Sequence, residues 1–308
     1  MEDTIFDDAR FHDEDAARKH LESIRWPNGP VCPHCGASGR ICRIESQSEE
    51  KGKGARPGLL FCGDCRKQFS VTVGTVFERS KVPLHKWVLA THLLCSSKKG
   101  ISSHQLHRTL GVTYKTAWFM THRIREAMKN DTAEMLGGSG PVEADETFVG
   151  NKPGAKIRRG WGHKNAVFSL VERNGEVRSF HVANVTAETL KPILKEQVTQ
   201  GAHLMTDDGR QYLPIGREFA KHDVVKHSTG EYVRGDAHTN TVEGFFSIFK
   251  RGIYGVYQHV SPCHLHRYTT EFDFRFNHRE KLGFDDTMRE AKALKGISGK
   301  RLTYRRTD

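Results

Sequence analysis

Two closely spaced pairs of cysteines constrain the fold of this chain more than any other feature of its sequence. The pairs are Cys32 with Cys35 and Cys62 with Cys65, and 26 residues separate one pair from the other. Each Cys-x-x-Cys turn offers two thiolates, and two such turns close a tetrahedral zinc site. Four cysteines fill the coordination of zinc, so we expect a structural rather than a catalytic metal. We expect Gly36 and Gly63 to let the two turns fold, and His34 is either a substitute ligand or a solvated loop residue.

The remaining composition favours a protein that acts on nucleic acid in a reducing compartment. The chain has 308 residues, enough for two or three domains, and its net charge is +11. A basic excess of this size favours a polyanionic partner, most often nucleic acid, although a merely basic soluble protein remains the alternative. The three other cysteines are scattered, which suits a metal site better than a disulfide framework. The acidic N-terminus predicts no signal peptide, and no apolar run predicts a membrane span.

The segment after the cysteines predicts a helix-turn-helix. Residues 13–25 are expected to form a short helix, residues 68–77 a strand with a bend at Gly74, and residues 84–95 a helix. Further along, Ser103 is expected to cap one helix, Gly111 to supply a turn, and Thr113 to cap the next helix. A small helical bundle that makes no DNA contact is the alternative.

The second of these helices has an apolar side and a basic side. Its expected inward-facing residues are Ala117, Met120, Ile124 and Met128, and its expected outward-facing residues are Lys115, His122, Arg123 and Arg125. A recognition helix presents basic residues to phosphates and the major groove, so Lys115, Arg123 and Arg125 are candidate DNA contacts.

The second half of the chain changes to a mixed pattern. Strands are expected at 141–149, 166–172, 177–184, 202–206 and 223–227, with helices at 186–199, 212–220 and within 235–252. Pro192 is expected near the first turn of its helix, where proline is tolerated. The order strand, strand, strand, helix, strand, helix, strand, helix is that of the ribonuclease-H-like fold, so an α/β domain with a mixed five-stranded sheet is predicted.

Three acidic residues fall at positions where such a sheet would bring them together. Asp145 lies inside the first strand, Asp207 at the end of the fourth, and Glu243 on the following helix. Carboxylates that share one edge repel each other unless cations lie between them, and Mg²⁺ or Mn²⁺ suits such ligands. Two ions about 3.5–4 Å apart can hold both oxygens of an in-line phosphoryl transfer. Asp208 is an alternative to Asp207, which would then be only a turn residue.

The helix within 235–252 has two distinct faces. Its apolar stripe consists of Val242, Phe245, Phe246 and Phe249, and its polar face of Asn240, Glu243, Ser247 and Lys250. Lys250 is predicted to hold a phosphate. Alternatively, Asn240 and Glu243 form a capping box and Lys250 is simply solvated. On the strand, Glu143 and Asp145 are expected to share one face, whereas Glu146 points away.

Further basic residues are candidate DNA contacts. The loop 151–164 carries Lys156, Arg158, Arg159 and Lys164 around Trp161, and Arg251 follows Lys250 in the later helix. His238 either orients a phosphate or is a loop histidine. The tail beyond residue 282 is basic and is expected to be a flexible segment that contacts phosphates.

Several motifs resemble those of zinc-ribbon DDE transposases of bacterial insertion sequences. They are RWPNGPVCPHCG (25–36), FCGDCRKQFSVTVGTVFERS (61–80), KTAWFMTHRIREAM (115–128), VEADETFVGNK (142–152), TDD (206–208) with Tyr212, HTNTVEGFFSIFKRGIYGVYQHVS (238–261) and HLHRYTTEFDFRFNHR (264–279). The similarity spans about residues 10–280. By position it implies that Asp145, Asp207 and Glu243 bind the catalytic metal ions and that Lys250 faces phosphate. Some members of the family have Asn as third ligand, which leaves Asn240 as an alternative to Glu243.

The resemblance implies that the protein is a transposase. The protein is expected to bind the terminal inverted repeats of its element, to nick DNA there, and to join the freed 3′-hydroxyl to target DNA. It is expected to act in the bacterial nucleoid as at least a dimer. The expected domains are 1–80 (ribbon), 81–130 (helix-turn-helix), 131–140 (linker), 141–282 (catalytic) and 283–308 (tail). An inactive DNA-binding regulator, or a nuclease without strand transfer, is the alternative.

Overall fold

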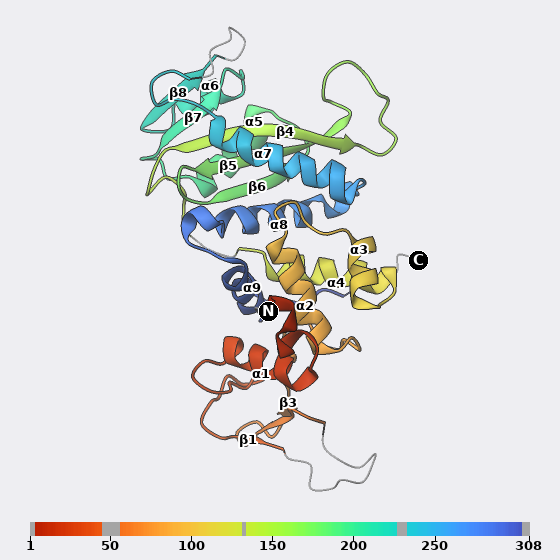
Figure 1. Ribbon diagram of the computed structural model, residues 1–308. Helices are drawn as coiled ribbons and strands as arrows, with labels where there is room; N and C mark the ends of the chain where they lie inside the picture. The colour runs from red at the N-terminus through yellow and green to blue at the C-terminus, as the bar shows by residue number, and fades with distance from the viewer. Residues whose placement is uncertain (1–3, 45–55, 131–133, 227–232, 304–308) are drawn as a thin grey trace. The chain divides into compact units, whose positions relative to one another are not determined.

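The computed structural model describes residues 4–44, 56–130, 134–226 and 233–303, and Figure 1 shows its helices and strands. The chain forms two compact units. The first, which we call the ribbon unit, combines residues 1–97, 101–128 and 285–308, and the second, the sheet unit, combines 98–100 and 129–284. Most of the insert between the cysteine pairs, part of the predicted linker and the end of the tail lie outside the described residues.

The ribbon unit begins with helices and a small sheet. Its first elements are the 3₁₀ turns η1 (Ile5–Asp7) and η2 (Ala9–Phe11), helix α1 (Glu14–Arg25), and strands β1 (Ile41–Arg43), β2 (Leu60–Cys62) and β3 (Gln68–Phe69). The three strands pair antiparallel in the order β1-β2-β3. The predicted strand over 68–77 is wrong beyond β3. Thr75 donates to the Thr72 carbonyl at 2.6 Å and accepts from the Phe77 backbone, and such local bonds favour turns over pairing.

The two helices of the predicted helix-turn-helix are confirmed, although one cap differs. They are α3 (Ser103–Leu110) and α4 (Tyr114–Ala127), and they follow α2 (Leu84–Ser96). Ser102, not Ser103, caps α3 by accepting from the Gln105 backbone. Gly111 ends α3 at φ +60°, a conformation that favours glycine, and Thr113 caps α4 as predicted.

The predicted flexible tail is wrong for its described part. Residues Asp286–Lys295 form helix α9, which begins at the Asp285 cap and packs against α1, α2 and α4 within the ribbon unit. Ala293, Leu294 and Ile297 are almost completely buried. The buried Glu290 carboxylate accepts from His20 and His92 and lies 3.5 Å from Arg10. The basic residues of this segment outnumber its buried apolar ones, so its composition alone predicts a solvated tail.

The sheet unit is built on one mixed sheet of five strands. They are β4 (Val142–Asn151), β5 (Lys164–Glu172), β6 (Val177–Val182), β7 (His203–Asp207) and β8 (Lys221–Val225). Their order is β6-β5-β4-β7-β8; β4, β5 and β6 pair antiparallel, whereas β4, β7 and β8 pair parallel. The five predicted strands are confirmed, and this arrangement fits the ribonuclease-H-like fold.

Helices cover both faces of this sheet (Figure 1). Helices α5 (Ala187–Gln197) and α6 (Tyr212–Gly216) contribute Leu190, Leu194, Tyr212 and Ile215 to the core on one face. Helices α7 (Asn240–Gly252) and α8 (Leu265–Asn277) cover the other face. The predicted apolar stripe of α7 is confirmed, because Val242, Phe245, Phe246 and Phe249 are all buried there. The short elements η4 (Ile253–Tyr257), η5 (Pro262–His264) and η6 (Glu280–Leu282) complete the unit.

Three details of the predicted helices differ. Pro192 is the sixth residue of α5, not part of its first turn. α6 ends at Gly216, shorter than the predicted 212–220, because a turn and then β8 follow within five residues. Asn240 is the first residue of α7 and not its cap; Thr239 occupies the cap position, so the capping box of Asn240 with Glu243 is wrong.

None of the helices that the structure describes combines the length and the apolar character that a membrane crossing requires.

Candidate active site and metal centres

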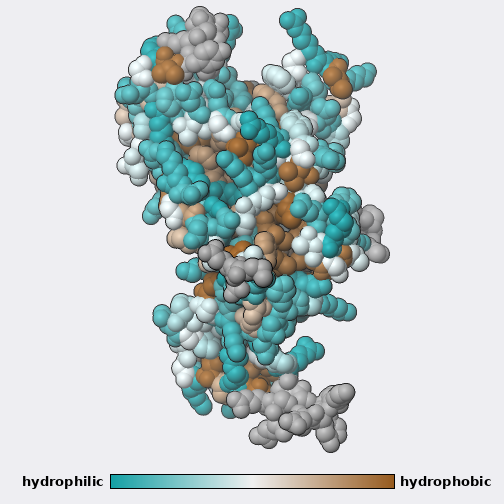
Figure 2. All heavy atoms as spheres, in the orientation of Figure 1, coloured by the Kyte–Doolittle hydropathy of each residue, from teal (hydrophilic) through white to brown (hydrophobic). Residues whose placement is uncertain are grey.

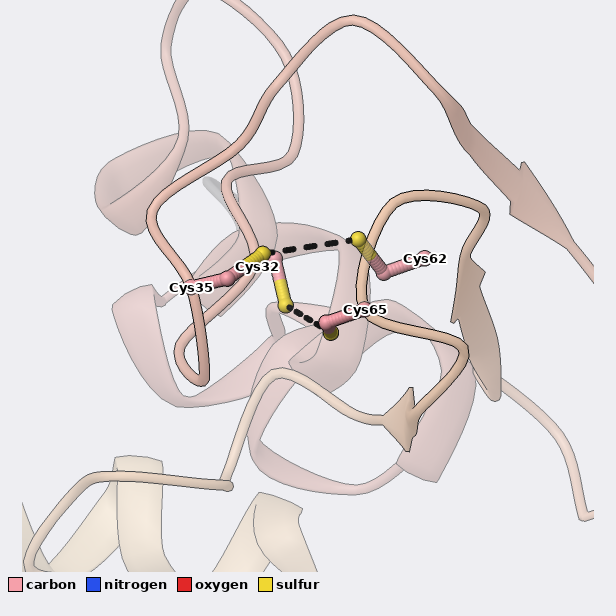
Figure 3. Close-up of side chains that lie close together, drawn as sticks. All are labelled: Cys32, Cys35, Cys62 and Cys65. Carbon is pink, nitrogen blue, oxygen red and sulfur yellow. Dashed lines mark hydrogen bonds between the residues drawn. The ribbon is translucent and has the colours of Figure 1, made fainter.

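The four cysteines of the ribbon unit converge on one point (Figure 3). Their sulfur atoms all lie within 4.8 Å of one another. The Cys32 and Cys65 sulfurs are 3.6 Å apart, and the Cys35 and Cys62 sulfurs 3.7 Å. Zinc–sulfur bonds of about 2.3 Å in a tetrahedron place sulfurs about 3.8 Å apart, so the four side chains fit a structural zinc ion.

The backbone of the two turns prepares the sulfurs for a metal. Gly36 follows its pair at φ +78°, as expected, but in the second turn Arg66 takes this role at φ +57° while Gly63 lies beside Arg40. Burial opposes ionisation of Cys32, yet hydrogen bonds from the backbone of His34 and Cys35 prevail and bring its pKa to about 7. Burial and the neighbouring thiols raise the pKa of Cys65, and against a hydrogen bond from the Ala37 backbone they raise that of Cys35 to about 12. Cys32 is therefore the thiol that ionises first, and the others need the cation itself in order to ionise.

In the sheet unit, Asp145 and Asp207 lie on adjacent strands and face the same side. Ala144 of β4 pairs with Thr206 of β7, so the next residue on each strand is one of the two aspartates. Ala144 and Leu204 face the core under α5, and side chains alternate along a strand. Asp145 and Asp207 therefore face the α7 side. Asp207 also accepts from the Gly209 backbone at 3.0 Å, so it takes part in the Asp-Gly turn as well.

Helix α7 brings Glu243 toward the same side of the sheet. Its first turn is held by Glu143, whose buried carboxylate accepts from the backbones of Thr241 and Val242 at 2.8 and 3.0 Å. Glu243 lies one residue further and accepts from the Thr239 hydroxyl at 2.8 Å. Glu143 thus shares the α7 face with Asp145, as alternation along the strand predicts.

Electrostatics link the three acidic residues. Burial raises the pKa of Asp145 to about 8, and the charges of Glu146, Asp207 and Glu243 contribute to the rise. A group is affected this way only by carboxylates close enough to repel its charge. Among the described residues, the four cysteines are the one set of three or more side chains already gathered closely enough to hold a single ion. Asp145, Asp207 and Glu243 do not form such a set, although carboxylate oxygens are the type of ligand that Mg²⁺ and Mn²⁺ prefer.

Glu146 points to the opposite face, again as predicted, and there it has partners that sequence reasoning missed. Its carboxylate accepts from the Tyr212 hydroxyl and, at 3.1 Å, from the Gln211 side chain. Burial raises its pKa, and so does the charge of Asp207. Tyr212 is fully buried on α6, the helix that follows Asp207. The sequence feature that could have indicated these partners is the run of polar residues directly after the fourth strand.

The remaining residues of α7 and the preceding loop have distinct surroundings. Asn240 and Lys250 are exposed, and Lys250 lies about 10 Å along the helix from Glu243. The His238 ring nitrogen lies 3.3 Å from the Glu143 carboxylate and accepts from the Asn240 backbone at 3.4 Å. His238 is therefore part of the network around Glu143.

The candidate DNA contacts of α4 divide into two groups. Lys115 is exposed, and Arg123 is half-buried over the Phe119 ring. The predicted exposure of His122 and Arg125 is wrong, because both are buried and Arg125 donates to the Thr121 hydroxyl at 3.1 Å. Arg125 therefore belongs to the interior of the ribbon unit, and helical spacing alone does not separate it from Arg123.

The loop between β4 and β5 presents basic and apolar side chains together. Lys156, Arg158 and Arg159 are exposed, and so are Ile157 and Trp161, at 76% and 58%. Trp161 stacks on Phe148 with ring centres 5.7 Å apart, and the Lys164 ammonium lies 4.9 Å from the Trp161 ring. Figure 2 shows hydrophobic spheres among hydrophilic ones at the end of this loop, at the upper right. Arg251, on α7, is also exposed.

A ribbon with four convergent cysteines and a mixed sheet with a group of carboxylates define a class: zinc-ribbon proteins with a ribonuclease-H-like domain. Comparison with known proteins agrees. The transposase zinc-ribbon domain matches residues 12–68, and the ISXO2-like transposase domain matches residues 136–277. The chain is 31% identical over 284 residues to an uncharacterized protein in transposable element ISH50 of Halobacterium salinarum, covering 86% of this chain and 91% of that protein. This chain belongs to the zinc-ribbon transposases of insertion sequences.

Proposed function

We propose that this transposase binds the terminal inverted repeats of its element, nicks DNA at the element ends and joins the 3′-hydroxyls to target DNA. Asp145, Asp207 and Glu243 hold the catalytic cations, and Lys250 holds a phosphate near them. The observation that supports this most is the strand register, which places Asp145 and Asp207 side by side on β4 and β7, facing the side of the sheet that α7 covers. Carboxylates that lie close together repel one another, and a cation between them offsets that repulsion.

The residues of the chain have separate roles in this reaction. Asp145 and Asp207, on adjacent strands, hold cations from the sheet, and Glu243 holds them from α7. When bound, a pair of Mg²⁺ or Mn²⁺ ions lowers the pKa of a water or 3′-hydroxyl and stabilises the departing oxyanion. Glu243 is preferred to Asn240 because its charge offsets that of the ions.

DNA contacts come from basic residues outside the buried cores of the two units. They are Lys115 and Arg123 on α4, Lys156, Arg158, Arg159 and Lys164 around Trp161, and Arg251 on α7. Contacts to phosphates supply most of the affinity and make it salt-dependent. Two element ends must be processed together, so we propose at least a dimer, acting on DNA in the bacterial nucleoid.

The test uses DNA that carries the sequences flanking the reading frame. The full-length protein is incubated with these duplexes in Mg²⁺ or Mn²⁺, and nicked and strand-transfer products are separated on denaturing gels. Asp145→Asn and Glu243→Gln are expected to lose both products, whereas Asp208→Asn is the matched control that retains them. Nicking without joining would indicate a nuclease, and DNA binding without nicking in the wild type would indicate a regulator.

A further inference from the structure

Glu143 is a heavily engaged carboxylate of the sheet unit. Its side chain is fully buried, yet it accepts from the Thr241 backbone and hydroxyl, both at 2.8 Å, and from the Val242 backbone at 3.0 Å. The Arg173 guanidinium donates to it at 2.7 Å. A buried carboxylate is costly unless its oxygens are paired in this way.

These bonds replace those that a helix usually receives from its own cap residue. The first backbone N–H groups of a helix lack partners within it, and a Ser, Thr, Asp or Asn at the cap position normally accepts from one of them. Thr239 occupies that position in α7, but its hydroxyl donates to Glu243 instead. The N–H groups of Thr241 and Val242 are satisfied from β4, where the negative charge of Glu143 also suits the positive end of the helix.

The loop before α7 is fixed by the same network. Arg173, in the turn between β5 and β6, donates to the carbonyls of Asp236 and His238 at 2.7 and 3.0 Å while it also contacts Glu143. One buried carboxylate therefore joins a central strand, a hairpin turn and the start of a helix.

The bonds of Glu143 lie close to Asp145 along β4 and close to Glu243 along α7. Glu143 and Asp145 share a face and are two residues apart, about 7 Å along β4. Glu243 lies two residues after Thr241, a rise of about 3 Å along α7. Glu143 and Asp145 belong to the same strand, and the N–H groups that Glu143 binds belong to the same helix as Glu243. No loop therefore lies between the Glu143 contact and either acidic residue.

We propose that Glu143 is a positioning residue that fixes Glu243 relative to Asp145 by capping α7 from the sheet. The inference rests on the proposed function, because it assigns Glu143 a role in placing the third metal ligand. Because both of its oxygens accept from protein donors, we assign Glu143 no direct contact with metal or DNA. One Glu143 oxygen accepts from both backbone N–H groups, and the other accepts from the Thr241 hydroxyl and the Arg173 guanidinium. In Glu143→Gln the charge is lost and the amide NH₂ must take one of these two places, where it meets a backbone N–H or a guanidinium that can only donate. The variant therefore weakens the link without changing the size of the side chain.

Glu172→Gln is a matched control. Glu172 is also a buried carboxylate of the sheet, and it accepts from the backbones of Gly137 and Ser139 at 3.0 and 2.9 Å, so its bonds go to the segment before β4 rather than to α7. Both variants remove the charge of a buried carboxylate that accepts from two backbone N–H groups, and Glu143→Gln also weakens the contact with Arg173. Only Glu143→Gln is expected to affect the acidic residues.

The experiment measures Mn²⁺ binding by electron paramagnetic resonance and amide hydrogen exchange over residues 239–246 in the full-length protein. Glu143→Gln is expected to lose exchange protection there and to bind Mn²⁺ about 10–100-fold more weakly, as loss of a supporting contact typically does. Glu172→Gln should change neither. The double variant Glu143→Gln, Glu243→Gln should bind Mn²⁺ no more weakly than Glu243→Gln alone, because Glu143 acts through Glu243.

Each other outcome overturns the inference in a recognisable way. Unchanged exchange in Glu143→Gln would refute the cap. Three results would refute positioning through Glu243 while leaving the transposase function intact. The first is lost exchange protection in Glu143→Gln with unchanged Mn²⁺ affinity, and the second is an equal loss of protection and affinity in Glu172→Gln. The third is an Mn²⁺ affinity of the double variant about tenfold lower than that of Glu243→Gln alone. A wild-type protein that neither binds Mn²⁺ nor nicks DNA would refute the proposed function itself, and the inference with it.

Discussion

Helix α9 is expected to be an integral part of the ribbon unit, and Leu294→Ala tests this directly. The Leu294 side chain is completely buried, and α9 packs against α1, α2 and α4. Removing a buried leucine side chain costs about 2–5 kcal/mol, the transfer free energy plus that of the cavity left behind. A domain is stabilised by only about 5–15 kcal/mol, so the variant should unfold the ribbon unit at much lower denaturant concentration.

The assay can isolate this unit because of where the tryptophans lie. The chain has four, and three of them (Trp26, Trp87 and Trp118) belong to the ribbon unit. In a Trp161→Phe background, fluorescence therefore reports unfolding of the ribbon unit alone. Release of zinc to a colorimetric chelator gives a second, independent signal. Both signals should shift together in Leu294→Ala.

The control is Leu190→Ala, which empties an equally buried site on α5 of the sheet unit. It should leave the tryptophan and zinc transitions in place. If Leu294→Ala changes the unfolding free energy by less than about 0.5 kcal/mol, as a surface substitution would, α9 does not contribute to the ribbon unit and the burial argument is refuted.

Three further outcomes follow from the same contacts. Cys62→Ser should abolish the bound zinc and the folded ribbon, seen as metal content and loss of the tryptophan transition, without removing the secondary structure of the sheet unit. Burial raises the pKa of Asp273 to about 7 against hydrogen bonds from Ser179, so the folded state keeps a proton that the unfolded state releases. Stability should therefore fall by up to about 4 kcal/mol between about pH 4 and 7, and Asp273→Asn should remove that slope in urea titrations. Trp161→Ala should weaken binding of single-stranded DNA by about 1–3 kcal/mol, with the salt dependence unchanged, as measured by fluorescence anisotropy; Arg158→Ala should instead lower the salt slope by about one.

The strands and acidic positions of the sheet unit are predictable because their signals are local. Alternating apolar residues, the turn Arg173–Glu176 and the Asp-Gly turn each determine a few neighbouring residues. Once the order of strands is given, β4 and β7 become neighbours, and Asp145 and Asp207 lie together without further information. The cysteine pairs are similarly local, which is why all four zinc ligands can be predicted from the sequence.

The features that the sequence does not predict depend on partners far away in the chain. α9 packs against α1, α2 and α4, which all lie in the first half of the chain, and only those helices show which of its side chains are buried. Glu290, for example, contacts His92, 198 residues earlier. Arg125 is expected outside because helical spacing gives the faces of α4 but not which of them other helices cover. The short strand β3 ends early because hydroxyl groups of Thr72 and Thr75 form local hydrogen bonds, a competition that strand alternation does not reveal.

The acidic residues beside Asp145 illustrate the same limit within the site. Alternation places Glu143 and Glu146 on opposite sides of β4, and solvation is the simplest interpretation of both. Instead, Glu143 contacts the start of α7, which carries Glu243, and Glu146 contacts Tyr212, five residues after Asp207. One short stretch of β4 therefore contributes an acidic residue to the proposed site and contacts both segments that carry the other two. Because each contact needs a donor from a distant segment, it exists only in the folded chain.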